Sequence, residues 1–281
     1  MTAPNGRFAD SGGILMVSGT LTIDGSVISN NSASLSTAMP NDVPDETFAG
    51  TGGIHIEGDD SCADPSNCVQ ATIRNSTISD NSVTASNSLG DSFAAGGGIG
   101  DDGSLVLRDS TVGNNHVSAT VPAGLTACAC ADSGGIGTGG IETISDTHIT
   151  GNTVTTTAPD GNAIAISGGG SVGNGLSISI SDSLISGNRI TATTTTGTAT
   201  VIGAGFGNGA VLEIRGTAIS DNTGTAEGPT GTAQGGGISN LLFPGATPGQ
   251  LTLIDSAVVD NTLSGDPGIT IRAAACSQPS P

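Results

Sequence analysis

The sequence predicts an all-β protein: a right-handed parallel β-helix solenoid of about seven coils, with three short strands per coil and projecting β-arms. An eleven-residue block occurs seven times without internal gaps, and its successive copies end 34 to 50 residues apart. A repeat period in this range is typical of stacked-repeat architectures. The blocks are rich in Ile, Val and Thr, which favour strands. The abundance of glycine and β-branched residues disfavours a helical repeat, and parallel crossovers are right-handed.

The block supplies two of the three strands. Its first copy, residues 21–31, has apolar residues at the third and eighth positions, Ile23 and Ile28, and the turn pair Asp24-Gly25 between them. This spacing predicts a strand, a bend and a second strand. Every copy ends in asparagine: Asn31, Asn81, Asn115, Asn152, Asn188, Asn222 and Asn261. Because identical positions of a solenoid stack, we expect these side chains to form a structural ladder that satisfies bent backbone.

A Gly-Gly-Ile element before the block supplies the third strand. Clear copies are residues 12–14, 52–54, 97–99, 134–136 and 236–238. Paired glycines indicate tight backbone geometry. A phosphate-binding loop would instead open a helix, and a strand follows here.

The β-arms follow each block asparagine as runs that alternate between apolar and hydroxyl residues. Four consecutive coils carry the hydroxyl array Thr84, Ser86, Ser118, Thr120, Thr155, Thr157, Thr191 and Thr193. A second alternating run returns after a turn, for example at residues 127–130 and 163–166. We therefore expect paired arms that form a thin flange, closed mainly by Ala and Val.

Length alone allows one or two domains, and the repeat count favours a single domain, residues 1–281, with repeats over about 11–265 and a C-terminal tail or cap at 266–281. The repeat pattern is already present at Ser11, so we expect a segment of a longer secreted precursor. The net charge of −19, with only six basic residues, argues against nucleic acid and anionic membrane surfaces as partners. No apolar run reaches the ~18 residues of a membrane span.

The cysteines give two expectations. Cys62 and Cys68 bracket a turn-rich loop, so they are a candidate disulfide of an oxidising compartment, with two unpaired thiols as the alternative. Cys128 and Cys130 lie two apart on a strand, where Cα atoms are roughly 6.5 Å apart. That separation is at the long limit for a disulfide, so we do not expect them to pair.

Carboxylates gather at the turn that follows two consecutive Gly-Gly-Ile elements. They are Glu57, Asp59, Asp60, Asp64, Asp101 and Asp102. Oxygen-rich loops of this kind can hold calcium, and the alternative is a hydrated acidic loop. No other cofactor is expected.

These motifs resemble the pectin-lyase-like superfamily of right-handed parallel β-helices over about residues 11–265. They are also similar to polymorphic outer-membrane-protein repeats, whose Phe-x-x-Asn motif is matched at residues 28–31 and 78–81 with Ile for Phe. The resemblance implies the fold but not the function, because one fold hosts unrelated functions.

Members of this superfamily that cleave polysaccharides use clustered Asp residues, often with calcium, and a basic residue. Arg74, Arg108 and Arg215 share the fourth block position, but no Asp pair lies on the same strand face. The three histidines, His55, His116 and His148, fall at three different repeat positions. The sequence therefore predicts no catalytic residues.

We expect a non-enzymatic structural or interaction module of a secreted or cell-surface bacterial protein, adhesin-like or passenger-like. Its partner is not defined by the sequence; a glycan or a surface protein would suit it. The first alternative is binding to ice or another crystal surface through the hydroxyl array. The second is a pectin-lyase-like polysaccharide lyase or hydrolase.

Overall fold

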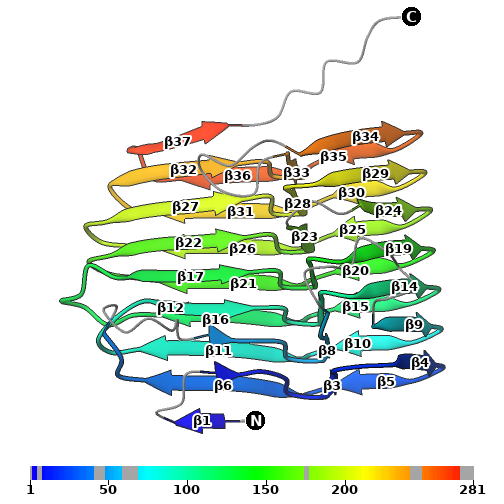
Figure 1. Ribbon diagram of the computed structural model, residues 1–281. Helices are drawn as coiled ribbons and strands as arrows, with labels where there is room; N and C mark the ends of the chain where they lie inside the picture. Colours follow the sequence, from blue (N-terminus) through cyan, green and yellow to red (C-terminus); the bar gives the residue numbers. More distant parts are fainter. Residues whose placement is uncertain are drawn as a thin grey trace, which may run out of the picture.

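The computed structural model describes residues 2–4, 8–40, 48–58, 69–173, 177–240 and 249–272 (Figure 1). Every element in this part of the chain is a β-strand, and the strands stack in five parallel sheets of seven or eight strands. Each complete coil adds one strand to each sheet, and the solenoid winds through about six turns. The predicted parallel β-solenoid is confirmed.

Three sheets form the body of the solenoid, and they correspond to the three predicted strands per coil. Body sheet 1 consists of β3 (Ile14–Met16), β8 (Ile54–Ile56), β13 (Ile99–Asp101), β18 (Ile136–Thr138), β23 (Gly170–Val172), β28 (Phe206–Asn208) and β33 (Ile238–Ser239). Body sheet 2 consists of β4 (Thr20–Asp24), β9 (Gln70–Arg74), β14 (Ser104–Arg108), β19 (Ile141–Ser145), β24 (Ser177–Ser181), β29 (Val211–Arg215) and β34 (Gln250–Ile254). Body sheet 3 consists of β5 (Val27–Ser29), β10 (Thr77–Ser79), β15 (Thr111–Gly113), β20 (His148–Thr150), β25 (Leu184–Ser186), β30 (Ala218–Ser220) and β35 (Ala257–Val259).

Two further sheets form the arms, which lie on the side of the molecule opposite body sheets 2 and 3 (Figure 1). Arm sheet 1 consists of β1 (Thr2–Pro4), β6 (Ser32–Thr37), β11 (Ser82–Asn87), β16 (His116–Thr120), β21 (Thr153–Thr157), β26 (Arg189–Thr193), β31 (Thr223–Glu227) and β36 (Thr262–Gly265). Arm sheet 2 consists of β2 (Phe8–Ala9), β7 (Phe48–Ala49), β12 (Ser92–Ala95), β17 (Cys128–Asp132), β22 (Asn162–Ile166), β27 (Thr198–Ile202), β32 (Thr230–Gln234) and β37 (Ile269–Arg272). The strands β2 and β37 extend the repeat beyond the predicted bounds at both ends.

Two separate cores stabilise the body and the arms. The body core is built mainly from stacked Ile and Leu, such as Ile73, Leu107 and Ile144, all fully buried. The arm core lies between the two arm sheets and consists mostly of Ala and Val, such as Val117 and Ala163. Small side chains let the two arm sheets approach closely, which gives the thin flange expected from the sequence.

The predicted asparagine ladder is present at the corner between body sheet 3 and arm sheet 1. Each asparagine Oδ1 accepts two hydrogen bonds from the preceding asparagine, one from its backbone N–H and one from its Nδ2, at 2.8–3.1 Å. Each Nδ2 from Asn81 onward also donates to a backbone carbonyl of the coil before it, as Asn152 does to Val112. The ladder therefore pairs backbone groups that the bend would leave unsatisfied.

The paired glycines make room for this ladder. A Cβ at Gly135 would lie 2.9 Å from Asn152 Nδ2 and would also collide with the carbonyl of Gly169. Any larger residue would therefore separate the start of body sheet 1 from the ladder. The tight geometry expected from the Gly-Gly-Ile element follows from this contact.

A second internal ladder occupies the sixth block position, which is always Ser or Thr. The Ser110 hydroxyl donates to the carbonyl of Arg108, two residues earlier, and accepts the backbone N–H of Ser76 in the preceding coil. The same pair of bonds recurs at Ser76, Ser183, Thr217 and Ser256, and Thr147 makes the first of the two. Ser or Thr is therefore needed at this position because its hydroxyl pairs backbone groups at the bend between body sheets 2 and 3.

The bends also require left-handed backbone. One residue with φ between 48° and 58° stands between each pair of strands from body sheets 2 and 3: Gly25, Asn75, Asp109, Asp146, Asp182, Gly216 and Asp255. Only Gly, Asn and Asp enter this region at low cost. Many of the acidic residues therefore serve turns on the surface. Among the described residues, no helix is long and apolar enough to cross a membrane.

Candidate functional site

A cleft of about 330 Å³ lies at the corner where arm sheet 2 meets body sheet 1. It extends along the stack, with lining residues from Phe48 in one coil to Gly173 three coils later. The opening results from small residues on both walls. Gly50 and Ala95 stand at the end of arm sheet 2, and Gly100 and Gly137 face outward from body sheet 1.

Farther along the stack, the same corner is closed. The arm position that holds Ala95 and Asp132 is taken in the next two coils by Ile166 and Ile202, which are buried against each other. The backbone register continues without interruption. The cleft is therefore a property of side-chain choice at this corner.

His55 lies at the cleft wall between two carboxylates. Its Nδ1 is 2.7 Å from Asp10 Oδ1, and its Nε2 is 3.7 Å from Asp102 Oδ2. Burial by itself lowers the pKa of His55, but the interactions with Asp102 and Asp10 outweigh it and raise the pKa above its usual value. His55 thus holds two acidic side chains from neighbouring coils at the cleft.

Asp132 forms the second polar cluster of the cleft. Its Oδ1 accepts the Ser133 hydroxyl at 2.9 Å, and its Oδ2 accepts the Ser171 hydroxyl at 3.2 Å. The two hydroxyl oxygens lie 2.5 Å apart. Burial raises the pKa of Asp132 to about 6, although the serine hydrogen bonds oppose the shift. The hydrogen-bond partners of Asp132 are therefore neutral groups, the two serine hydroxyls and the backbone of Ser133.

Two more carboxyl groups lie behind the cleft, inside the body core. Asp101 and Glu142 are each 2% exposed, and Asp101 also lines the cleft. Asp101 Oδ1 accepts the Gly103 N–H at 3.0 Å, and the Glu142 carboxyl group lies beside that of Asp101 and the hydroxyl of Thr138. Burial raises the pKa of Asp101 to about 7. Burial, followed by repulsion from Asp101, raises the pKa of Glu142 well above its usual range.

The expected calcium patch is only partly described. Asp59, Asp60 and Asp64 lie outside the described residues. Asp101 is buried, the side chain of Asp102 is 59% exposed, and Glu57 is exposed, so Asp101 and Asp102 do not form one hydrated surface loop. Within the described residues, no group of three or more His, Cys, Asp or Glu side chains is placed to hold a metal ion. Calcium at the predicted loop stays a prediction.

The hydroxyl array is in register on the outer face of arm sheet 1. Thr84 pairs with Ser118, Ser118 with Thr155, and Thr155 with Thr191. The second column runs in the same way through Ser86, Thr120, Thr157 and Thr193, and Thr193 donates to Glu227 Oε2 in the next coil. These side chains are partly or fully exposed. The array thus forms two parallel columns without charge over four coils.

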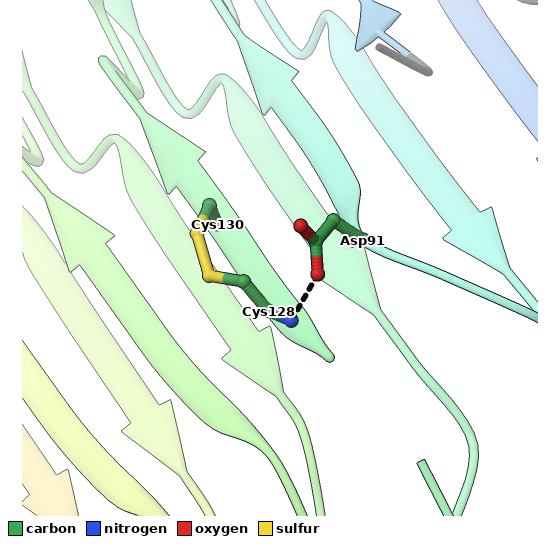
Figure 2. The surroundings of a disulfide bond; sticks show 3 residues. All are labelled: Asp91, Cys128 and Cys130. Atoms are coloured by element: carbon green, nitrogen blue, oxygen red, sulfur yellow. Dashed lines mark hydrogen bonds between the residues drawn. A yellow bond between two sulfur atoms is a disulfide. The ribbon is translucent and has the colours of Figure 1, made fainter. Parts of the chain in front are cut away.

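One expectation about the cysteines was wrong. Cys128 and Cys130 form a disulfide, with their Cα atoms 5.7 Å apart (Figure 2). The strand is locally shorter than the regular spacing assumed from the sequence, so the separation falls within the range that a disulfide spans. The Cys128 N–H donates to Asp91 Oδ1 at 2.6 Å beside the bridge. Cys62 and Cys68 lie outside the described residues.

The arginine column also forms, but away from the cleft. Asp24, Arg74 and Arg108 stack in body sheet 2, and Arg74 Nη2 lies 2.9 Å from Asp24 Oδ2. Hydrogen bonds from Asn75 and Arg74 lower the pKa of Asp24. Both side chains of the ion pair are more than 40% exposed, so it is a solvated surface pair. The three histidines lie in three different sheets, as expected.

A second hollow, of about 400 Å³, lies at the C-terminal end of the body and contains apolar side chains such as Leu251, Val258 and Leu263. Asp260 is its only ionisable lining residue among those described. The corner cleft, where several titratable groups meet, is therefore the better candidate site.

Sequence reasoning named His55, Asp101 and Asp102 but did not place them in one cleft, and it missed Asp10 and Asp132, although a signal was present. The pentapeptide Asp-Ser-Gly-Gly-Ile occurs twice, at residues 10–14 and 132–136. Both aspartates stand at the same corner position, and both line or reach the cleft. Comparison of this position across coils would have marked Asp10 and Asp132 as departures from Gly50, Ala95 and Ile166. Comparison with family models, curated proteins and solved structures finds no match for this chain.

Proposed function

We propose that this protein is a non-enzymatic binding module, a rigid solenoid that presents the corner cleft to a partner at a cell surface or in the extracellular space. One observation carries the proposal: the cleft interrupts a corner that Ile166 and Ile202 fill elsewhere, and polar groups from several coils converge in it. Concave sites with few convergent polar groups are the usual ligand sites of proteins.

Binding suits these groups better than catalysis. The Ser133 and Ser171 hydroxyls are engaged with each other and with Asp132, while His55 is engaged with Asp10 and Asp102. The usual base beside a serine nucleophile is a histidine, and the described residues give these two hydroxyls Asp132 as a partner and no histidine. The arginine column is solvated and lies in another sheet, so it gives no support to a lyase or hydrolase.

An extracellular location is supported by the chemistry of the chain. A disulfide between Cys128 and Cys130 persists in an oxidising compartment. The net charge of −19 keeps a protein soluble and separate from anionic surfaces. These properties suit a secreted or surface-attached bacterial protein whose partner is a glycan or another surface protein.

The test is a binding screen against arrays of glycans and surface proteins, with Ala95→Ile as the matched variant. Ile at this position reproduces the residue of the closed corner, so the variant should fold and fill the cleft. We expect at least one ligand that binds the wild type and loses tenfold or more affinity in Ala95→Ile. If both proteins bind every ligand equally, or if no ligand binds at all, the proposal that the cleft is the binding site is wrong.

A second candidate function is favoured by the register of the hydroxyl array. Two columns of uncharged Ser and Thr side chains, at the ~4.8 Å spacing between coils, could order water at an ice or crystal surface. Thermal hysteresis and ice recrystallisation measure this activity. We expect loss of any activity in the double variant Thr155→Lys, Thr191→Lys, and inactivity of the wild type would end this candidate.

A further inference from the structure

The acidic groups of the cleft outnumber the basic ones. Asp102 and Asp132 line it, Asp10 contacts His55 at its wall, and His55 is the one basic side chain among the described lining residues. Asp101 adds a further carboxyl group at the wall, buried beside Glu142. Low-dielectric walls of one charge sign concentrate ligands of the opposite sign. The cleft therefore repels anions and attracts cations.

Asp132 is the carboxylate that most needs a cation. His55 lies within ion-pair distance of Asp10 and Asp102, but no described basic side chain forms an ion pair with Asp132. Its two hydroxyl partners are neutral, and each carboxylate oxygen has lone pairs to spare. A charged N–H donor in the cleft would give Asp132 a stronger hydrogen bond than either serine does.

The cleft suits an organic cation better than a metal ion. The described side chains do not form a group of three ligands for one ion, whereas a volume of about 330 Å³ accommodates a small molecule or a long side chain. Phe48 and Ala95 give part of the wall an apolar surface. Phe48 can contact an aliphatic stem, and its ring face can attract a nearby ammonium group.

We propose that the cleft binds a primary ammonium group on an aliphatic chain, placed between Asp102 and Asp132, with the stem against Phe48. This proposal rests on the proposed binding function and specifies its ligand chemistry. A free alkylamine and the lysine side chain of a partner protein share this chemistry. A basic partner would also be attracted by the strong negative charge of the whole chain.

Isothermal titration calorimetry at pH 7.5 and low salt tests the proposal with n-butylammonium, n-butanol and butyrate. We expect binding of n-butylammonium only, weaker at high salt, and at least tenfold weaker in Asp132→Asn. Asp146→Asn is the matched control, because Asp146 is an exposed carboxylate at a bend of the body and the change in charge is the same. Nα-acetyl-lysine amide and a lysine-containing peptide form a second arm. Tighter binding of the peptide than of n-butylammonium identifies a protein partner, and the reverse identifies a free amine.

Proton release gives an independent readout. At pH 6, part of the Asp132 population is protonated, so ammonium binding should release protons and the enthalpy should depend on the ionisation enthalpy of the buffer. His55 and Asp101 line the same cleft and also have raised pKa values, so the comparison is with Asp132→Asn, in which the release should fall. Equal affinity for n-butanol, or equal loss in Asp146→Asn, would overturn the proposal.

The two proposals fail in different ways. If n-butylammonium and the lysine probes do not bind, but a glycan or protein binds in a manner lost in Ala95→Ile, the ammonium proposal is wrong and the cleft still has a binding function. If no ligand distinguishes wild type from Ala95→Ile, both proposals are wrong.

Discussion

The corner between arm sheet 2 and body sheet 1 has two halves with the same backbone and different chemistry. In the N-terminal half, Asp10, Gly50, Ala95 and Asp132 occupy the arm position and leave a cleft. In the C-terminal half, Ile166 and Ile202 occupy the equivalent position and pack against each other. The strand register is the same in both halves. The difference shows that the fold does not require the cleft.

The open half carries a cost in stability that the closed half avoids. Asp132, Asp101 and Glu142 all have raised pKa values because of burial, so their charged forms are less stable in the folded protein. For such groups, stability is fully present below the unfolded pKa and is lost as the pH rises through the folded pKa. The open half should therefore weaken between about pH 4 and pH 7, while the closed half does not change.

The largest expected effect is in Glu142→Leu. Glu142 stands in a column of buried apolar residues, between Leu105 and Ile178. Replacement of this buried carboxyl group, which also repels Asp101, with Leu should raise the free energy of unfolding by about 1–4 kcal/mol at pH 8. At pH 4, where Glu142 is protonated, the gain should be much smaller. Urea denaturation at both pH values measures it, and an equal gain at both would contradict the charge explanation.

Asp132→Ile makes the open half resemble the closed half. A pKa raised from 3.8 to about 6 corresponds to up to about 3 kcal/mol of lost stability at pH 8. Because Asp132 is partly exposed, we expect the variant to gain about 2 kcal/mol at pH 8 and little at pH 4. Thermal unfolding monitored by circular dichroism at the two pH values is sufficient. A loss of stability at pH 8 would show that the serine hydrogen bonds to Asp132 stabilise the folded protein by more than the burial of its charge costs.

The asparagine ladder tests whether the two halves share one frame. Asn152→Ala, beside the open half, and Asn222→Ala, beside the closed half, each remove one fully buried rung. Each should lower the free energy of unfolding by about 1–3 kcal/mol, because backbone groups lose their partners. Chemical denaturation of the two variants in parallel gives the comparison. Losses that differ by more than about 1 kcal/mol would mean that the corner chemistry alters the ladder.

The smallest expected effect is in Thr156→Val, which lies in the arm core away from the corner. Thr156 takes the position of Ala119 and Ala192, and its hydroxyl is buried without a hydrogen-bond partner. Removal of this hydroxyl should stabilise the protein by up to about 1 kcal/mol at every pH. A pH-dependent change here would indicate that the titrating groups are not confined to the corner. Thermal unfolding at pH 4 and pH 8 is the measurement.

The repeated features of the fold could be predicted from sequence because each one recurs in most or all of the coils. The block asparagines, the Gly-Gly-Ile elements and the alternating arms all predict positions that stack from coil to coil. Asn152 accordingly lies in the ladder, and Ile144 is buried in the body core. The arms were predicted to form a flange of Ala and Val, and Ala163 and Val117 confirm it. These predictions were confirmed because the repeat positions are regularly spaced in the sequence.

The site could not be predicted in the same way, because it depends on departures from the repeat. Asp132 and Ser171 come from different coils, and only the stacked register brings them together. His55 was dismissed because the histidines do not converge, yet its partners are aspartates. The Cys128–Cys130 bridge was missed because a regular strand was assumed, and the local Cα separation is shorter.

The asparagine ladder has a consequence for how such a chain can change over evolutionary time. Successive rungs are separated by as few as 34 and as many as 50 residues, while every link has nearly the same length. Each coil thus adds one rung to the ladder, whatever the number of residues in that coil. A loop can lengthen without disturbing the rungs on either side, and duplication of a whole repeat adds one rung with both neighbours already compatible. The length of the rod can therefore change in units of one coil, while surface loops diversify independently.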